Sequence, residues 1–464
     1  MWFLILLCQA AAFATTGLPV RLGTPVARLV ARGGAAVAAA LSASAGSSAS
    51  PSYGKSGPTN EVVETVTGIR QKRLGGGDII VSEVGLGTQR WVSDDLNAPC
   101  EKDCFALMDE AILNSGVSLI DTASQYPIPS SPSRPEGLTE ITIGKWMKER
   151  KARDKTVIAT KIVGSSHVSK KAIVMDCESS LKRLQTDYID VYLLHWPARY
   201  SPQSNWGQSL AYHQDAEKYY QGHASFEDIC SAMGNLIKAG KIRGYGFCND
   251  NAFGLTAAHY TAKALGVDPP CCLQGDYSLI DRKSEENAVA EACSPIHTNS
   301  GFMAYNVLAG GQLTGKYLET RGLGLMDRLF AKRNGDWADP AMASSFRGRF
   351  DDRSWGRTLY RYQSGPAVEA TQLYKKIADA NGISLTELAL RWSKQQELPT
   401  TSLLGVSSLG QLKEDLKFFA NPEPLSGLIE ASVDRVHMLN RNPIFANDRW
   451  SGEAGVGFIG ERIP

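Results

Sequence analysis

Eight short runs of β-branched and apolar residues recur along this chain of 464 residues, and helical patterns separate them. Alternating strands and helices predict a parallel sheet, and eight strand–helix units are the number that closes such a sheet into a barrel. The sequence therefore predicts an α/β fold of the (β/α)8 TIM-barrel type. The eight runs cover residues 81–88, 118–123, 156–161, 188–195, 242–249, 271–278, 301–308 and 401–406.

The segments between these runs indicate helices, a hairpin and long loops. Residues 70–82 (RQKRLGGGDIIVS) combine Gly-rich turn chemistry with apolar flanks, which predicts an N-terminal β-hairpin ahead of the first barrel strand. Three inserts, at 127–138, 199–224 and 318–362, leave the C-terminal ends of strands, where the long loops of such a barrel build the substrate pocket. Apolar residues at i, i+3, i+4 and i+7 predict helices within 104–116, 170–185, 225–241 and 367–382.

Four polar side chains stand at or just after the ends of three successive runs. Asp121 lies in the second run and Tyr126 just after it, Lys161 ends the third run and His195 ends the fourth. The steps of 40 residues from Asp121 to Lys161 and 34 from Lys161 to His195 match one strand–helix unit. Because the C-terminal ends of barrel strands share one face, we expect these four side chains to converge there.

Together these four groups can assist the reduction of a carbonyl by a hydride donor. A phenol with a pKa of about 10 is a weak proton donor unless a cation lowers its pKa. Lys161 can supply that cation, Asp121 can hold it charged, and His195 can donate a hydrogen bond to a C=O. Such a site delivers a proton to the oxyanion that forms when a hydride arrives from a cofactor, and it needs no metal.

Each residue taken alone has a simpler explanation. Asp121 could cap the helix after its strand, Lys161 could be a surface lysine, and His195 could be a packed core histidine. Their joint occurrence at successive strand ends favours a catalytic site. Trp91 and Trp196, also at strand ends, could line the substrate pocket or serve packing, and the sequence leaves both interpretations open.

The chain resembles the aldo-keto reductase superfamily over residues 68–442. The stretches that carry the resemblance are VSEVGLGTQRW, LIDTASQYPIP, VIATKIVG, YIDVYLLHWP, GKIRGYGFCND and LLGVSSLGQLKEDL, and they are most similar to the bacterial Tas-type reductases. The resemblance implies that Tyr126 is the proton donor, that Lys161 and Asp121 tune it, and that His195 orients the carbonyl.

The resemblance also implies an NADP or NADPH cofactor. Asn249 and Gln274 would bind the nicotinamide carboxamide, Tyr305 would stack on the ring, and Ser407 would accept the 2′-phosphate together with a nearby cation. Arg361 is a candidate contact to the pyrophosphate, whereas the other arginines of its insert are predicted to form a solvated loop. The full set of implied cofactor residues is Gly87, Thr88, Asn249, Gln274, Tyr305, Asn306, Leu308, Lys316, Gly405, Ser407, Gln411 and Glu414.

Several positions depart from the family pattern. Cys248 stands where a serine commonly precedes the asparagine, and Gly275 stands where an asparagine follows the glutamine. Tyr305 is followed by Asn306 and not by serine, and Asp415 replaces an asparagine of the last motif. None of these residues belongs to the catalytic four, and the effect of Asp415 on cofactor choice is left open.

The composition excludes some classes of function. The net charge of +1 gives no nucleic-acid footprint. The nine cysteines show no zinc-site spacing, which predicts no metal and a reducing compartment with inert thiols. The predicted partner is a small-molecule carbonyl substrate, with no nucleic acid and no membrane span in the mature protein. The oligomeric state is not predicted.

The first 60 residues are predicted to be a targeting leader, and residues 61–464 the reductase barrel domain. Residues 2–13 form an apolar run suited to a secretory signal, and an Ala- and Ser-rich stretch without acids follows, as in transit peptides. This two-part leader predicts a plastid location. Secretion and mitochondrial import are the alternatives.

The predicted activity is therefore NADPH-dependent reduction of an aldehyde or ketone to an alcohol. One alternative is a regulatory, redox-sensing subunit that binds NADP and turns over slowly. A second is a sugar dehydrogenase working in the oxidative direction, because the same four residues serve both directions.

Overall fold

The computed structural model describes residues 57–95, 97–164, 168–201, 212, 214, 224–318, 350, 360–441 and 443. The predicted leader lies outside these residues except for its last four. Most of the inserts at 199–224 and 318–362 also lies outside them.

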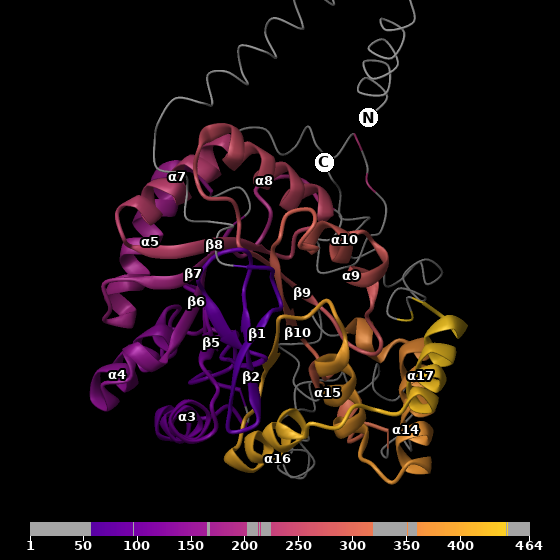
Figure 1. Ribbon diagram of the computed structural model, residues 1–464. Coiled ribbons are helices and arrows are strands. Elements are labelled where there is room, and N and C mark those ends of the chain that lie inside the picture. Colours follow the sequence, from indigo (N-terminus) through magenta and orange to yellow (C-terminus); the bar gives the residue numbers. More distant parts are fainter. Residues whose placement is uncertain are drawn as a thin grey trace, which may run out of the picture. The chain divides into compact units, whose positions relative to one another are not determined.

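All eight predicted runs form strands, and the strands close into the predicted barrel (Figure 1). Neighbouring strands are parallel throughout, in the order β10-β11-β4-β5-β6-β7-β8-β9. The fold prediction is thereby confirmed. The barrel strands are β4 (Val84–Gly87), β5 (Leu119–Asp121), β6 (Val157–Ile162), β7 (Ile189–Leu194), β8 (Ile242–Cys248), β9 (Cys272–Asp276), β10 (Gly301–Tyr305) and β11 (Thr401–Leu404).

The predicted N-terminal hairpin is present as β2 (Ile69–Arg73) and β3 (Ile80–Ser82), which pair antiparallel. A further strand, β1 (Val62–Val66), pairs with β2 and makes the small sheet three-stranded. All five residues of β1 are exposed, so no alternation of buried and exposed positions marked it in the sequence. Just before it, Thr59 and Asn60 hydrogen-bond to Asn299 and Glu397.

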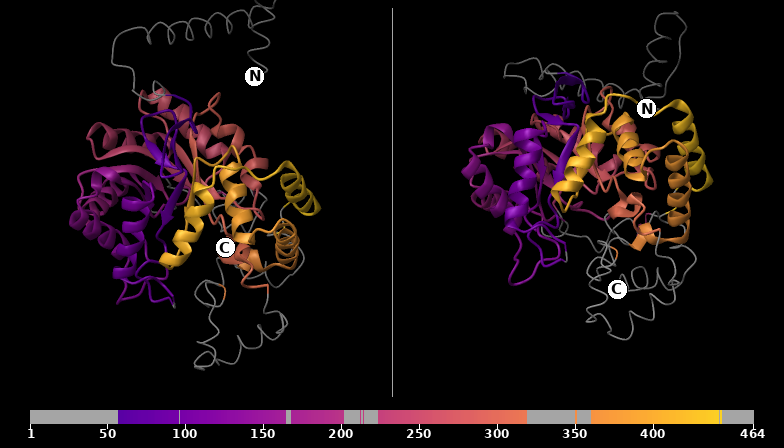
Figure 2. Two further views of the ribbon diagram at one scale, coloured as in Figure 1. Left: turned by 60° about the horizontal axis from the view of Figure 1, so that its bottom comes forward. Right: turned by 90° about the horizontal axis from the view of Figure 1, so that it is seen from below.

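The small sheet closes the end of the barrel at which the strands begin. Leu74, Ile79 and Val81 pack against apolar residues of the barrel interior, including Leu119 and Met303. In Figure 1 the small sheet lies across the ring of strands, and Figure 2 shows the same indigo segment at one end of the barrel. The opposite end, where the strands finish, carries the predicted site.

Helices surround the barrel, and serine or asparagine side chains cap many of them. Ser169, Ser225, Asn251, Ser384 and Ser408 each accept a hydrogen bond from a first-turn N–H of the helix that follows. The helical elements are α3 (Glu101–Met108), η1 (Asp109–Asn114), α4 (Leu138–Arg150), η2 (Arg153–Lys155), α5 (Lys170–Leu184), α7 (Phe226–Lys238), α8 (Ala252–Leu265), α9 (Lys283–Glu286), α10 (Val289–Cys293), η6 (Ala309–Thr314), η9 (Tyr360–Gln363), α14 (Gly365–Ala380), α15 (Leu385–Gln395), α16 (Leu409–Ala420) and α17 (Gly427–Leu439).

Membrane spans and metal clusters can be assessed only for the part of the chain described above. Among those residues, no helix is long and apolar enough to cross a membrane. Within the same ranges, no group of three or more His, Cys, Asp or Glu side chains is placed to hold a metal ion. The eight cysteines that are described carry free thiols.

The buried His259 on α8 makes the stability of the fold depend on pH. Both its ring nitrogens are buried without a hydrogen-bond partner among the described residues, and burial with the nearby Lys263 lowers its pKa from 6.5 to about 4. The unfolded chain therefore binds more protons between these two values, so stability falls as the pH falls from about 6.5 towards 4. We expect urea unfolding to give a free energy about 1 kcal/mol lower at pH 5 than at pH 7 from this residue.

His259→Leu should remove that part of the pH dependence while keeping the apolar contacts. The buried His195 also has a lowered pKa, so it too reduces stability as the pH falls. This contribution is the same in both proteins. If the free energy of unfolding differs between pH 5 and pH 7 by as much in His259→Leu as in the unaltered protein, the assignment is wrong.

Candidate active site

The four predicted catalytic residues lie together at the C-terminal ends of neighbouring strands. Asp121 ends β5, Lys161 lies in β6, His195 directly follows β7, and Tyr126 lies in the loop after β5. Lys161 Nζ donates to Asp121 Oδ2 at 2.7 Å and to the Thr122 carbonyl at 2.8 Å. The Lys161 side chain is completely buried. Burial lowers the pKa of Lys161, but the attraction of the Asp121 carboxylate outweighs burial, so the pKa of Lys161 is raised.

Tyr126 lies against this ion pair. Its ring centroid is 5.1 Å from Lys161 Nζ and 5.7 Å from the His195 ring, which meets it edge-on. Burial raises the pKa of Tyr126 to about 12, and the Lys161 charge opposes that shift only in part. The sequence led us to expect a net lowering, and burial reverses its sign. Tyr126 is consequently a neutral phenol with a proton to donate at physiological pH.

His195 is a neutral imidazole in this site. Burial, together with the charge of Lys161, lowers its pKa well below the ordinary value of 6.5. Its Nδ1 atom is buried and has no hydrogen-bond partner within the described ranges. Trp196 stacks on the His195 ring with centroids 6.0 Å apart. A neutral histidine at this position can donate one N–H without adding a second positive charge beside Lys161.

The side-chain amides of Gln274, in β9, and of Asn249, just after β8, connect the catalytic residues to these two strands. Gln274 Nε2 donates to Asp121 Oδ1 at 2.7 Å, and the Cys248 thiol donates to Gln274 Oε1 at 3.2 Å. Cys248 therefore makes the hydrogen bond that a serine could make at the same position. Beside it, Asn249 Nδ2 donates to the His195 carbonyl at 2.9 Å. Tyr305 in turn donates its hydroxyl to Asn249 Oδ1 at 2.6 Å.

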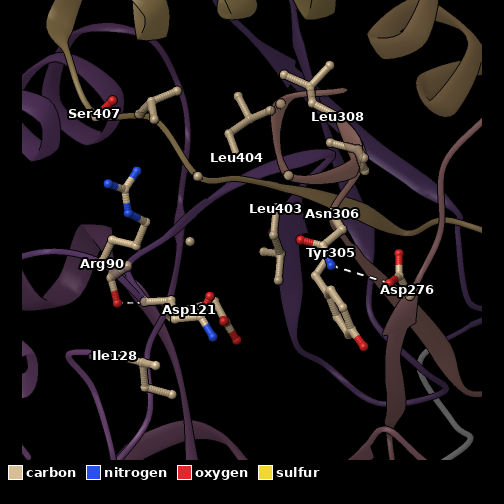
Figure 3. A pocket seen from close by; sticks show the side chains of 18 of the residues that line it. Arg90, Asp121, Ile128, Asp276, Tyr305, Asn306, Leu308, Leu403, Leu404 and Ser407 are labelled. Atoms are coloured by element: carbon tan, nitrogen blue, oxygen red, sulfur yellow. Dashed lines mark hydrogen bonds between the residues drawn. The ribbon is translucent and has the colours of Figure 1, made fainter. Parts of the chain in front are cut away.

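These residues open onto one cavity of about 1080 Å³, large enough for a dinucleotide together with a small substrate. Asp121, Tyr126 and His195 line it, whereas Lys161 lies behind them and does not. The cavity also brings together the twelve residues that the sequence assigned to a cofactor, and Figure 3 shows how some of them lie. They are Gly87, Thr88, Asn249, Gln274, Tyr305, Asn306, Leu308, Lys316, Gly405, Ser407, Gln411 and Glu414.

Residues 83–426 match the family model of the aldo/keto reductase family. The chain belongs to that family. It is 31% identical to Protein tas of Escherichia coli over 375 residues, which cover 78% of this chain and 96% of that protein. It is also 32% identical to an aldo-keto reductase of Babesia bovis over 303 residues, or 62% of this chain and 98% of that protein. A further relative is the aldo-keto reductase YhdN of Bacillus subtilis, 28% identical over 343 residues, with coverage of 72% and 84%.

Membership in the aldo/keto reductase family makes this protein an oxidoreductase that acts on small carbonyl substrates. The geometry described above is consistent with that chemistry. Both tryptophans that the sequence left open line the cavity, Trp196 beside His195 and the buried Trp91 in the loop after β4.

One part of this reductase site was not anticipated from the sequence. Asp276, at the end of β9, is buried and accepts hydrogen bonds from Arg361 Nη2 at 2.5 Å, from Asn306 Nδ2 at 3.3 Å and from the Tyr362 hydroxyl (Figure 3 shows the Asn306 bond). Asn306 has a left-handed backbone with φ of 56°, so this cluster fixes the turn that follows Tyr305. Arg361 lines the cavity as proposed, but its charge is paired with Asp276.

The structure shows the surroundings of two of the positions that depart from the family pattern. A Cβ at Gly275 would lie 3.0 Å from Phe302 Cζ, so the packing of β10 disfavours a larger residue there. Asp415 is buried beside Glu414, and burial with that neighbouring charge raises its pKa to about 7. Both acids line the end of the cavity at α16, where Ser407 and Gln411 are joined by a hydrogen bond of 3.2 Å.

Proposed function

We propose that this protein reduces an aldehyde or ketone to an alcohol with NADPH, and that Tyr126 is the proton donor. The observation that carries the proposal is the fully buried Lys161–Asp121 ion pair at 2.7 Å beside the neutral phenol of Tyr126. A buried ion pair that lies directly behind a protonated phenol at a cavity wall is a means of stabilising a phenolate at the moment the proton leaves.

The residues of the cavity fit a nicotinamide dinucleotide. Gln274 keeps one N–H and one oxygen lone pair beyond these hydrogen bonds, and Asn249 keeps one oxygen lone pair, which suits a carboxamide. A Cβ at Gly405 would meet no atom within 4 Å, so the chain there leaves room for a ligand. The bound cofactor would supply a hydride to the carbonyl carbon of the substrate.

The protein's own side chains would supply the proton that the substrate oxygen takes up after the hydride has been transferred. Neutral His195 would donate a hydrogen bond to the substrate oxygen, and Tyr126 would transfer its proton to that oxygen as negative charge develops there. Lys161, kept charged by Asp121, would stabilise the phenolate that remains. Trp196 and Trp91 would exclude water from the carbonyl.

The test is NADPH consumption by the purified protein over a panel of neutral aldehydes and ketones, followed by absorbance. Turnover of at least one carbonyl supports the proposal. Tight retention of NADP with very slow turnover would instead indicate the regulatory subunit, and NADP-dependent oxidation of sugars without carbonyl reduction would indicate the dehydrogenase. Absence of turnover with both NADPH and NADH would contradict an enzymatic role.

We also propose that the protein acts in a plastid, on the strength of the signal-like run at 2–13 and the acid-free stretch after it. Residues 1–60 fused to a fluorescent protein are expected to direct it into plastids of a host that has plastids of secondary origin. Residues 14–60 alone, without the signal-like run, should leave the reporter outside them. Secretion of the longer fusion, or its import into mitochondria, would contradict the proposal.

A further inference from the structure

Arg199 and Asp250 form an ion pair that joins the loop after β7 to the turn after β8. Arg199 Nη1 donates to Asp250 Oδ2 at 2.9 Å, and Arg199 Nη2 donates to Asp250 Oδ1 at 2.6 Å. The side chain of Asp250 is 1% exposed and that of Arg199 is 23% exposed. Two parallel N–H···O bonds of this kind fix orientation as well as distance, so the pair restrains both segments.

Arg199 is also attached to the helices that follow these segments. Its Nη2 donates to Asn251 Oδ1 at 3.1 Å, and the same oxygen caps α8 by accepting from the Gly254 N–H. Asp250 packs directly against this first turn, because a Cβ at Gly254 would lie 2.2 Å from Asp250 Oδ1. The guanidinium carbon of Arg199 lies 5.5 Å from the ring centroid of Phe226, the first residue of α7. The position of Arg199 is therefore set by two helices.

The two segments that Arg199 joins carry His195 and Asn249. His195 comes four residues before Arg199, and Asn249 directly precedes Asp250. A hydrogen bond from Asn249 Nδ2 to the His195 carbonyl already connects the segments at the cavity wall. Under the proposed function, His195 contacts the substrate oxygen and Asn249 the nicotinamide carboxamide. The spacing of the two segments then sets where the carbonyl carbon lies relative to the hydride donor.

The turn at Asn249 depends on its surroundings. Its backbone is left-handed, with φ of 58°, a conformation that a residue other than glycine keeps only when its neighbours impose it. Its N–H donates to the Gln274 carbonyl at 3.0 Å, and the next residue is held by Arg199. We propose that Arg199 is a positioning residue that, through Asp250, holds Asn249 and His195 at the spacing that hydride transfer requires. This inference rests on the proposed function for the roles of those two residues.

The test uses the full-length double variant Arg199→Met/Asp250→Asn, because Arg199→Met alone leaves a buried carboxylate unpaired and opposes folding. The protein loaded with NADPH is mixed with a saturating aldehyde, and NADPH absorbance is followed through the first turnover. The rate constant reports the chemical step, whereas the amplitude reports how much of the protein is active. Since a displacement of about 1 Å can cost about 10²-fold, we expect the rate constant to fall roughly 10- to 100-fold. The amplitude and the Kd for NADPH should stay nearly unchanged.

Arg199→Lys tests the geometry of the contact. Lysine keeps the positive charge but cannot bridge both oxygens of Asp250 as the planar guanidinium does. Its rate constant should therefore lie between those of the unaltered protein and the double variant.

Hydrogen exchange in the cofactor-free protein gives a readout that needs no turnover. The N–H groups of His195 and Asn249 donate to the Ile162 and Gln274 carbonyls. We expect both amides to exchange faster in the double variant, because local opening of these segments becomes easier. Amides in the rest of the barrel should exchange as before.

Arg70→Met/Glu83→Gln is the matched control. Arg70, with its side chain 35% exposed, is paired with Glu83, whose side chain is 1% exposed, and neither residue lines the cavity. This double variant removes a similar ion pair near the opposite end of the barrel. It should leave the rate constant and the exchange of His195 and Asn249 unaltered.

An unaltered rate constant in Arg199→Met/Asp250→Asn would overturn the proposal. A loss of amplitude alone would mean that the pair serves folding only, and a raised KM for a charged aldehyde with the same rate constant would mean that Arg199 contacts the substrate; both results reject a positioning role. If the unaltered protein reduces no carbonyl, it is the proposed function that fails. The exchange of His195 and Asn249 then still decides whether Arg199 positions the two segments.

Discussion

Replacing Lys161 by methionine is expected to lower kcat/KM for carbonyl reduction by roughly 10³-fold or more. The substitution removes the charge that opposes the raised pKa of Tyr126, so the phenol becomes a still weaker acid and its phenolate loses its stabilising partner. It also leaves the Asp121 carboxylate buried without its ion pair, which costs about 3–5 kcal/mol of folding stability. Steady-state kinetics and urea unfolding measure the two effects separately.

Lys145→Met is the control for this substitution. Lys145 Nζ also lies 2.7 Å from a carboxylate, that of Glu101, but both side chains are about half exposed, at 48% each. An exposed pair contributes about 0–1 kcal/mol, so activity and stability should both stay close to those of the unaltered protein. If Lys161→Met behaved like Lys145→Met, the buried ion pair would have no role in either catalysis or folding.

Replacing Tyr126 by phenylalanine is expected to reduce kcat by roughly 10²- to 10⁴-fold, the range for loss of a proton donor. The ring keeps its place against Lys161 and His195, and only the hydroxyl is lost. NADPH affinity should therefore change little, so binding and turnover separate in this variant. Fluorescence titration and NADPH consumption on the same preparation measure both.

Tyr260→Phe makes the same chemical change at an exposed tyrosine of α8 and should have no effect. Retention of most of the activity by Tyr126→Phe would mean that another group donates the proton. Loss of NADPH binding in this variant would contradict the assignment of Tyr126 to the chemical step alone.

The barrel could be read from the sequence because its strands are buried on both faces and so appear as continuous apolar runs. The C-terminal ends of neighbouring barrel strands lie on one face of the barrel. For this reason the sequence alone could place Asp121, Lys161 and His195 close together. Strand β1 could not be found in the same way, since its residues bury nothing.

Within the site, the sequence could not give contacts that depend on how distant segments meet. Asp276 and Arg361 are separated by 85 positions, and no local pattern pairs them. The sequence also could not give the direction in which the pKa of Tyr126 shifts, because that depends on whether burial of the phenol outweighs the nearby Lys161 charge. The roles assigned to the site residues stay predictions until the variants are measured.

The small sheet of β1, β2 and β3 closes the barrel at the end away from the active site. This affects the order in which reactants bind and products leave in each catalytic cycle. Leu74 and Ile79 fill that end, and the cavity of about 190 Å³ outside them shares no lining residue with the large one. Within the described residues, a cofactor and a carbonyl compound that both occupy the large cavity would therefore not pass through this end of the barrel. If the nicotinamide binds against Tyr305 as proposed, the carbonyl compound would arrive second and the alcohol would depart first. Steady-state kinetics would then be sequential and ordered, with release of the oxidised dinucleotide as the last step.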